Sequence, residues 1–444
     1  TDDQAPWALK ASGYAQAHTP NMDRLAREGA YLPNSFTVTP VCSPSRAALM
    51  SSRYGSELGI TDWLNHGSTK YPGEATLGLD PAIVTFPEVL AAAGYRNALV
   101  GKWHLGDLDK YHPTAQGFHY FMGFRGGGTT TDNPTLEKDG VEQQFEGMTV
   151  DILTDHALAF LEENTQRPFL LCLFHRSPHT KWLPVADEDW APFADLDPEI
   201  PNPDYPDLDV ERVKQMTKEY LASVAGVDRN LGRILEALER LGLAENTMVV
   251  YSSDHGYNMG HNGIWHKGNG HWIVKNPPEG TENVPKGQRP NMYDNSLRVP
   301  TMVRWPGVVK PGTVIEQTVT NLDWYPTFAA VAGGSIPESE TVRGRNLVPL
   351  LRGEAVPGWD NDLYAEYSTK HQSRTHMRAY RTPEYKLVRD FLNPERDEFF
   401  DLKKDPAESR NEIKNPEYAP IVADLHEKIV ANMRKVKDPV AQGL

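Results

Sequence analysis

Cysteine is scarce in this chain of 444 residues, which contains only Cys42 and Cys172. Cys172 lies in the apolar segment PFLLCLFH, which predicts a buried strand, so we do not expect a framework of disulfides. Long apolar runs are also missing: no stretch of about eighteen apolar residues occurs, so no membrane span is predicted. Cys42 is therefore available for chemistry other than a structural crosslink.

Positive charge is the second shortage. The chain has 45 Lys and Arg against 60 Asp and Glu, which gives a formal net charge of −15 at pH 7. This balance argues against a general nucleic-acid-binding protein, because such proteins need basic patches that neutralise phosphates. A few Lys and Arg can still form a local positive pocket in an acidic protein, so the composition allows an anionic substrate.

The opening TDDQ lacks apolar residues before its two carboxylates, Asp2 and Asp3. Neighbouring side chains on a regular strand point to opposite faces, but both can reach one cation at the end of a strand, where the backbone turns. Neither an initiator Met nor a signal peptide precedes Thr1, so the sequence does not define the compartment.

What the chain does contain is a regular alternation of elements. Helical spacing covers residues 21–29, 86–94, 147–163 and 210–241, and strand-like segments cover 31–38, 96–100, 169–174 and 247–252. This alternation predicts an α/β fold whose large, mostly parallel mixed sheet is sandwiched by helices. Ligands of such sheets bind at the carboxyl ends of the strands.

The pattern changes after residue 351. Residues 377–380 and 385–389 predict a hairpin, 398–402 a third strand, and 418–435 a helix. We therefore divide the chain into a domain over 1–351, expected to carry the functional site, and a smaller α+β subdomain over 352–444. Within the first domain, residues 268–291 are rich in Gly, Asn, Pro and Lys, and we expect them to form a surface loop beside the site.

The segment VCSPSRAALMSSRYG, residues 41–55, is the most informative one. Pro44 and Ser45 suit a helix start, so a helix is predicted to open at Ser45 with Arg46 in its first turn. The free N–H groups at such a start attract anions, and a guanidinium beside them can bind an oxyanion through two donors. A nucleophile derived from Cys42 would face a tetrahedral anion there.

Other polar residues follow the predicted strands. Lys102 and His104 stand two residues apart in GKWHLG, and His179 follows a proline in SPHT. Asp254 and His255 follow another strand in SDHG. Hard oxygen ligands from separate strand ends suit calcium or magnesium, although a nitrogen ligand such as His255 is unusual for calcium.

The segments DD, CSPSR, GKWHLG, PH, SDHG and the later Lys267 resemble, in order and identity, the pattern of type I sulfatases. These are the formylglycine-dependent members of the alkaline phosphatase superfamily. SLRVPTMVRWPG at 296–307 and YKLVRD with FFDLKKDPAE near the C-terminus look like further landmarks, so the resemblance covers nearly the whole chain. It implies the alkaline phosphatase-like fold, with a first strand that is truncated here.

The resemblance also implies a nucleophile and a metal site. Cys42 would be oxidised to formylglycine by a formylglycine-generating or other sulfatase-maturating enzyme. Asp2, Asp3, Asp254 and His255, together with the modified Cys42, would hold a divalent cation. The family favours Ca2+, with Mg2+ as the alternative, and it favours a periplasmic or secreted location.

The remaining roles are implied in the same way. Lys102 and Lys267 would neutralise sulfate oxygens, and Arg46 would orient the formylglycine hydrate. His179 would protonate the leaving oxygen. His104 would then take a proton from the remaining hydroxyl, so that the aldehyde re-forms and sulfate leaves.

The expected activity is hydrolysis of a sulfate ester on a carbohydrate, an oligosaccharide or polysaccharide. Lys102, His179 and Lys267 are expected to contact the ester, and His271 and Trp272 the sugar. Further aromatic candidates for stacking on sugar rings are Trp63, His66 and Trp182. Two alternatives stay open: a phosphonate or phosphodiester hydrolase of the same superfamily, and a non-catalytic protein that binds sulfated glycans and keeps Cys42 unmodified.

Overall fold

A sheet of five strands organises much of the N-terminal part of the molecule. In the computed structural model, which describes residues 1–65 and 72–442, the strand order is β6-β5-β4-β3-β7. Strand β3 pairs in parallel with β4 and β7, and β5 and β6 add antiparallel at one edge. The strands are β3 (Arg96–Lys102), β4 (Tyr120–Phe124), β5 (Thr135–Lys138), β6 (Val141–Gln144) and β7 (Phe169–Phe174).

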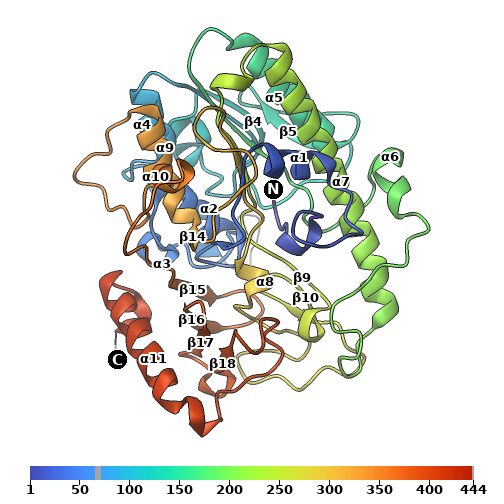
Figure 1. Ribbon diagram of the computed structural model, residues 1–444, viewed down its shortest axis with the longest axis vertical. Helices are drawn as coiled ribbons and strands as arrows, with labels where there is room; N and C mark the ends of the chain where they lie inside the picture. Colours follow the sequence, from blue (N-terminus) through green and yellow to red (C-terminus); the bar gives the residue numbers. More distant parts are fainter. Residues whose placement is uncertain (66–71, 443–444) are drawn as a thin grey trace.

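Helices cover both faces of this sheet (Figure 1). Successive side chains of β3 point to opposite faces, so Leu99 and Val100 enter different cores. Leu99 packs in a cluster with side chains of α2 (Cys42–Ser51), α4 (Phe86–Ala92) and α9 (Trp324–Ala332). Val100 packs in a cluster with α5 (Thr149–Glu163). This arrangement confirms the α/β class predicted from the sequence.

A second, mixed sheet has the order β13-β1-β12-β8. Its strands are β1 (Ala30–Tyr31), β8 (Val249–Tyr251), β12 (Met302–Arg304) and β13 (Thr313–Val314). The expected single large sheet is thus divided in two, because β7 and β8 are edge strands and no described strand lies between them.

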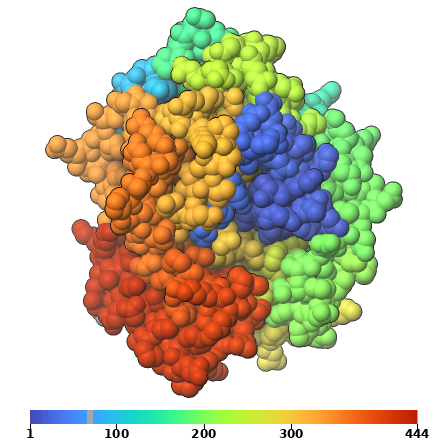
Figure 2. Space-filling view, in the orientation of Figure 1, coloured from blue at the N-terminus to red at the C-terminus, as the bar shows by residue number. Residues whose placement is uncertain are grey.

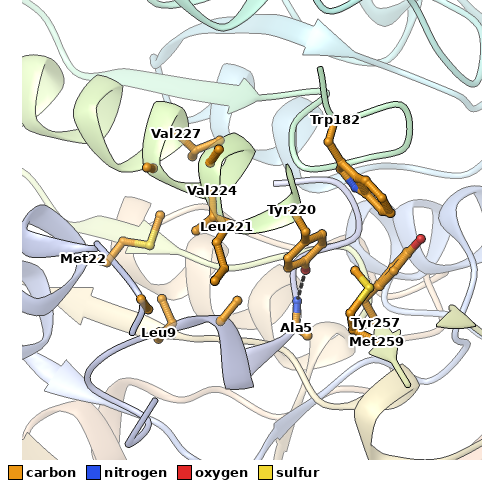
Figure 3. Packing of buried hydrophobic residues seen from close by; sticks show 14 of the residues in the cluster. Ala5, Leu9, Met22, Trp182, Tyr220, Leu221, Val224, Val227, Tyr257 and Met259 are labelled. Atoms are coloured by element: carbon orange, nitrogen blue, oxygen red, sulfur yellow. Dashed lines mark hydrogen bonds between the residues drawn. The ribbon is translucent and has the colours of Figure 1, made fainter. Parts of the chain in front are cut away.

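The long helix α7 (Val210–Arg240) and α1 (Pro20–Glu28) pack on the second sheet. Figure 3 shows the core that α7 shares with the N-terminal segment, in which Tyr220 lies among apolar side chains. The Tyr220 hydroxyl accepts a hydrogen bond from Ala5 N at 2.9 Å and donates one to Asp3 O at 2.7 Å. The core of α7 therefore fixes the backbone that carries Asp3.

Two smaller sheets complete this part of the fold. They are β14 (Val319–Thr320) with β2 (Ser35–Phe36), and β9 (Asn258–Met259) with β10 (Ile264–His266) and β11 (His271–Trp272). Because β11 falls inside residues 268–291, that segment is not purely an irregular loop. Its two arms form a short ladder, in which Trp272 N donates to Gly287 O and Arg289 N donates to Gly270 O.

The C-terminal part is an antiparallel sheet backed by α11 (Ala419–Lys435). Its strands are β15 (Leu363–Thr369), β16 (Thr375–Arg381), β17 (Tyr385–Asp390) and β18 (Glu398–Asp401). One face packs on α11, and the other packs against a cluster that includes Phe36 of β2 and Ala48 of α2. In Figures 1 and 2 this part, coloured red, forms one continuous region at the bottom of the molecule.

Most predicted elements lie within two residues of the observed ones. The predicted helix start at Ser45 is wrong, because α2 begins at Cys42 with the extended Val41 as its N-cap. Pro44 is therefore the third residue of the helix rather than a residue before it, and it fits there because the first N–H groups of a helix have no intrahelical partner. Among the described residues, no helix combines the length and the apolar composition that crossing a bilayer requires.

Candidate active site

Residues 1–4 lie between the carboxyl ends of β7 and β8. Asp2 N donates to the carbonyl of Ser177 beyond β7, at 3.4 Å, and Asp254 N beyond β8 donates to Thr1 O at 3.1 Å. Asp3 N donates to Asp254 Oδ1 at 3.0 Å. Asp3 has a φ of 70°, an uncommon conformation for a residue with a side chain, which turns the backbone between the two consecutive carboxylates.

Cys42, the first residue of α2, lies at the centre of the cluster and is 2% exposed. Its Sγ is 2.9 Å from Lys267 Nζ, 3.4 Å from His255 Nε2 and 3.5 Å from Asp2 Oδ1. All three partners are far from Cys42 in the sequence. The other cysteine, Cys172, is buried in β7 and is also unpaired.

The acidic residues around Cys42 fit a divalent cation. Ligand atoms of Asp2, Cys42, Asp254 and His255 all lie within 4.8 Å of one another. The Oδ2 atom of Asp3 is buried and has no hydrogen-bond partner, so it has an acceptor to offer. Buried carboxylate oxygens are the ligands that Ca2+ and Mg2+ prefer. The structure thus places a possible metal-binding cluster at the sulfur of Cys42.

Asp2, Asp3 and Asp254 each also contact a positively charged side chain. Lys102 Nζ is 2.7 Å from Asp2 Oδ2, and Lys267 Nζ is 2.7 Å from Asp3 Oδ1. Arg46 Nε is 3.0 Å from Asp254 Oδ2. Burial alone would raise the pKa values of Asp2 and Asp3, but the neighbouring lysines hold both well below their usual range. Asp2 and Asp3 are therefore ionised in the buried site.

Arg46 also donates from Nη1 to the carbonyl of Lys102 at 3.0 Å, so it connects the ends of β3 and β8. The hydroxyl of Ser45 donates to the carbonyl of Asp254. The first turn of α2 is thus fastened to the strand end that carries a candidate metal ligand. Arg46 is 4% exposed, so these contacts lie inside the protein.

His104 is held by one ring nitrogen only. Its Nε2 lies 2.9 Å from the carbonyl of Leu64, so Nε2 carries the proton and donates. The buried Nδ1 has no partner. Burial, followed by the charge of Lys102, lowers the pKa of His104 well below its usual value, so the ring is neutral and Nδ1 is a free acceptor. Leu64 N in turn donates to the hydroxyl of Ser43 at 3.0 Å.

His179 lies at the outer side of the cluster, with a side chain that is 23% exposed. Its Nδ1 donates to the carbonyl of Thr180 at 2.6 Å, and its Nε2 is 4.0 Å from Asp3 Oδ2. Burial, and then the charge of Lys267, lowers its pKa to about 4. His179 therefore combines a neutral ring with access from outside.

The two sugar-binding candidates point to different sides of β11. His271 packs beside Trp265 and His266, with ring centroids 5.8 and 5.7 Å apart. Trp272 lies under the guanidinium of Arg289 and packs on a core cluster with Ile264. Of the two, His271 thus lies beside the segment that leads to Lys267, whereas Trp272 has a packing role.

The further aromatic candidates are placed as follows. Trp182 is 4% exposed in the core with Tyr220 and Tyr257 (Figure 3), so it is a packing residue. Trp63 packs against His371, with the ring centroids 4.2 Å apart and the rings tilted by 36°. His66 lies outside the described residues.

His266 was not among the predicted site residues. It precedes Lys267, has a φ of 80°, and its Nδ1 is 2.8 Å from Asn269 Oδ1. Its pKa is lowered well below the usual value by burial and then by the charge of Lys267. The segment HNGIWHKG contains His266. Its left-handed backbone conformation, which turns His266 and Lys267 toward the same site, cannot be recognised from a single sequence.

Comparison with known proteins agrees with this geometry. The family model described as Sulfatase matches residues 1–335, and the one described as N-sulphoglucosamine sulphohydrolase, C-terminal, matches residues 288–435. The chain belongs to the sulfatase family. It is thus a sulfuric ester hydrolase, and the family predicted from the sequence is confirmed.

Three similar proteins illustrate the range of this family. N-acetylglucosamine-6-O-sulfatase of Bacteroides thetaiotaomicron is 26% identical over 99% of this chain and 86% of its own length. Steryl-sulfatase of Mus musculus is 29% identical, but the match covers 80% of this chain and 64% of that protein. A solved complex of a protein with its substrate, D-glucosamine-2-N,6-O-disulfate, superimposes with a TM-score of 0.83 at 24% identity and covers 99% of this chain and 97% of that one, which shows the same fold.

Proposed function

We propose that this sulfatase removes sulfate from a sulfated saccharide and uses residue 42 as the source of its nucleophile. The observation that carries the proposal is the position of Cys42 Sγ, at contact distance from Lys267, His255 and Asp2. An anion bound against this atom would meet ammonium groups and the free N–H groups of the α2 start.

The choice of a saccharide rests on the relatives. The N-acetylglucosamine-6-O-sulfatase aligns with 99% of this chain, whereas the steryl-sulfatase aligns with 80%. The C-terminal match, over residues 288–435, is likewise to an N-sulphoglucosamine sulphohydrolase region. A single sulfated amino sugar or a short oligosaccharide that ends in one is therefore the substrate class we favour.

Two groups complete the proposed site. Cys42 would be converted to formylglycine by a maturation enzyme, and the hydrated aldehyde would supply an oxygen nucleophile. A divalent cation, Ca2+ in our proposal and Mg2+ as the alternative, would be held by Asp2, Asp3, Asp254 and His255 with residue 42. When bound, the cation would offset the negative charge of the ester and favour a deprotonated nucleophile.

The lysines bind and orient the ester. Lys102 and Lys267 each place an ammonium group inside the buried cluster, 2.7 Å from a carboxylate oxygen. In our proposal these groups turn to the peripheral sulfate oxygens, where most of the charge of a sulfate ester resides. Arg46 keeps its contacts to Asp254 and to the carbonyl of Lys102, so it holds the ends of β3 and β8 together rather than binding substrate.

In our proposal, His179 and His104 transfer the protons of the reaction. His179 is neutral in the ligand-free site, and an anionic ester near Nε2 favours its protonated form. That proton would go to the leaving oxygen of the sugar. His104 has its proton on Nε2 and a free lone pair on Nδ1, so it would accept a proton from the nucleophilic group.

A panel of defined esters tests the proposal. Sulfate release would be measured for mono- and disaccharides sulfated on O6 or on the amino group, for a steroid sulfate, for an aryl sulfate and for an aryl phosphonate monoester. We expect the highest kcat/KM for one of the sulfated amino sugars. A higher kcat/KM for the steroid or the phosphonate would contradict the saccharide assignment, and no turnover of any ester by enzyme whose residue 42 is fully modified would contradict the proposed function as a whole.

A further inference from the structure

A buried acid–histidine–acid cluster lies beside the candidate active site. His371, in the connection between β15 and β16, places Nδ1 3.0 Å from Asp62 Oδ2 and Nε2 2.8 Å from Glu74 Oε2. All three residues are less than 9% exposed. The ring of Trp63 covers the imidazole at 4.2 Å between centroids. Nothing in the proposed reaction uses this cluster.

The geometry makes His371 a clamp between two points of the chain. Both ring nitrogens face a carboxylate, so the doubly protonated ring can donate in two directions at once. Burial alone would lower the pKa of His371, but the hydrogen bonds and charges of Asp62 and Glu74 outweigh it and raise the pKa. Such charge-assisted bonds are shorter and stronger than neutral ones.

The clamp fixes the segment that touches His104. Asp62 Oδ2 also accepts from Lys370 N at 2.7 Å, and Glu74 Oε2 accepts from Asn65 N at 3.3 Å. Leu64 lies between Asp62 and Asn65, the two residues that the clamp holds. Its N–H donates to the hydroxyl of Ser43, and its carbonyl accepts from His104 Nε2. The position of one carbonyl group in the site is therefore set from the C-terminal part of the chain.

We propose that Asp62, Glu74 and His371 are positioning residues that fix the tautomer of His104. They hold the Leu64 carbonyl against Nε2, which keeps the proton there and leaves the lone pair of Nδ1 free. The role of Nδ1 as a base rests on the proposed function, but the tautomer itself does not. The connection between β15 and β16 is, on this view, part of the catalytic apparatus and not only a support.

The tautomer is measurable without activity. In protein labelled with 15N-histidine, made with Cys42 unmodified and free of metal, the nitrogen shifts of His104 report which nitrogen carries the proton, and loss of the signal in His104→Gln assigns it. We expect protonated Nε2 in the wild type. In His371→Gln, whose amide can donate to only one of the two carboxylates, and in Asp62→Asn, we expect a mixture of the two tautomers. His376→Gln is the matched control, because His376 lies in the adjoining strand β16 and bonds Ser368 instead.

The catalytic consequence is tested with an aryl sulfate on fully modified enzyme. We expect His371→Gln and Asp62→Asn to lower kcat by about 10- to 100-fold, as loss of an orienting partner does. KM should fall with kcat, so that kcat/KM changes by less than about 2-fold, because kcat/KM reports only the steps up to release of the alcohol. If His104 acts after the alcohol has left, these variants should also release a burst of one alcohol per site before the slow steady state.

Each outcome decides one question. A wild-type tautomer of His104 in both variants would overturn the inference, whatever the activity. A shifted tautomer with unchanged kcat would sustain the positioning contact and contradict the role of His104 in the proposed reaction. If His371→Gln does not fold, Asp62→Asn carries the same test, because an amide oxygen can still accept the backbone N–H of Lys370.

Discussion

The floor of the site and its rim are built on different principles. On the floor, Asp2, Asp3 and Asp254 are each paired with a Lys or Arg side chain at 2.7 to 3.0 Å, and the side chains of these pairs are at most 5% exposed. On the rim, residues 268–291 and the β15–β16 connection meet through neutral hydrogen bonds, such as Arg374 N to Asn283 O at 2.6 Å. The floor is thus a network of ion pairs, and the rim consists of loops joined by hydrogen bonds.

This difference separates chemistry from selectivity. Removing one member of a buried charge network leaves its partner unpaired, which costs several kcal/mol and disturbs every neighbour. Removing a rim side chain leaves the network intact. Changes on the floor should therefore affect all substrates equally, and so should changes to His371, which acts on the floor through Leu64 and His104. Changes to rim side chains that face the substrate should distinguish one substrate from another.

The two cysteines give the largest expected contrast. We expect Cys42→Ala to lower turnover by about 10^5-fold or more, since alanine has no thiol group from which the formylglycine aldehyde could be made. Cys172→Ala removes an equally buried sulfur from β7 and should lower the free energy of unfolding by about 1 kcal/mol with turnover unchanged. Steady-state kinetics and urea unfolding of both variants measure this contrast, and comparable turnover in the two would refute the role of Cys42.

Asp254→Asn should break the floor next. The change removes a candidate metal ligand and the partner of Arg46, so we expect a loss of turnover on the order of 10^3-fold together with weaker binding of Ca2+. Titration calorimetry measures the binding. Asp228→Asn is the control, because Asp228 is a buried acid that accepts instead from the N–H groups of Asn21 and Met22. Unchanged Ca2+ affinity in Asp254→Asn would remove this residue from the metal site.

A milder change tests how closely the floor is fitted. A Cβ at Gly127 would lie 2.8 Å from His104 Nε2 and 2.9 Å from its Cε1, whereas a Cβ at Gly126 meets nothing within 4 Å. We expect Gly127→Ala to displace the ring and to lower kcat by about 10^2-fold. Gly126→Ala should retain wild-type kcat. Equal kcat values for the two variants would show that His104 has room to move.

The amount predictable from the sequence also differs between floor and rim. Lys102, Asp254 and Lys267 stand at fixed offsets from elements with clear apolar patterns, so short motifs were enough to bring them together. The contacts of Leu64 and His371 depend on a carbonyl direction and on a hairpin connection, and these follow from packing over long sequence distances. No local pattern encodes them.

Helix α2 shows the same limit on a smaller scale. Ser45 and Pro44 are typical of helix starts, yet the helix begins at Cys42, because Val41 takes up the extended N-cap conformation. The ladder between residues 270 and 289 was likewise hidden by Gly and Pro content, which indicates a loop but does not exclude backbone pairing across it.

The rim supplies the smallest expected effect. Deleting residues 270–289 would also remove Ile273 and Val284, which are at most 1% exposed, so point substitutions are the sharper test. We expect His271→Ala to lower kcat/KM for the saccharide by about 10-fold, the value of one hydrogen bond, and to leave an aryl sulfate unaffected. Trp272→Ala should instead lower the free energy of unfolding by about 2 kcal/mol with no preference between substrates. The opposite assignment of the two effects would reverse our reading of β11.

The most direct test of the account is the mass of the peptide that contains residue 42, taken from enzyme of known specific activity. Preparations made with and without a maturation enzyme would be compared for the fraction of formylglycine at this position and for sulfate release from a sulfated amino sugar. The account predicts that activity rises in proportion to the modified fraction and is lost when that fraction is zero. Full activity in protein that carries only the unmodified thiol of Cys42 would contradict it.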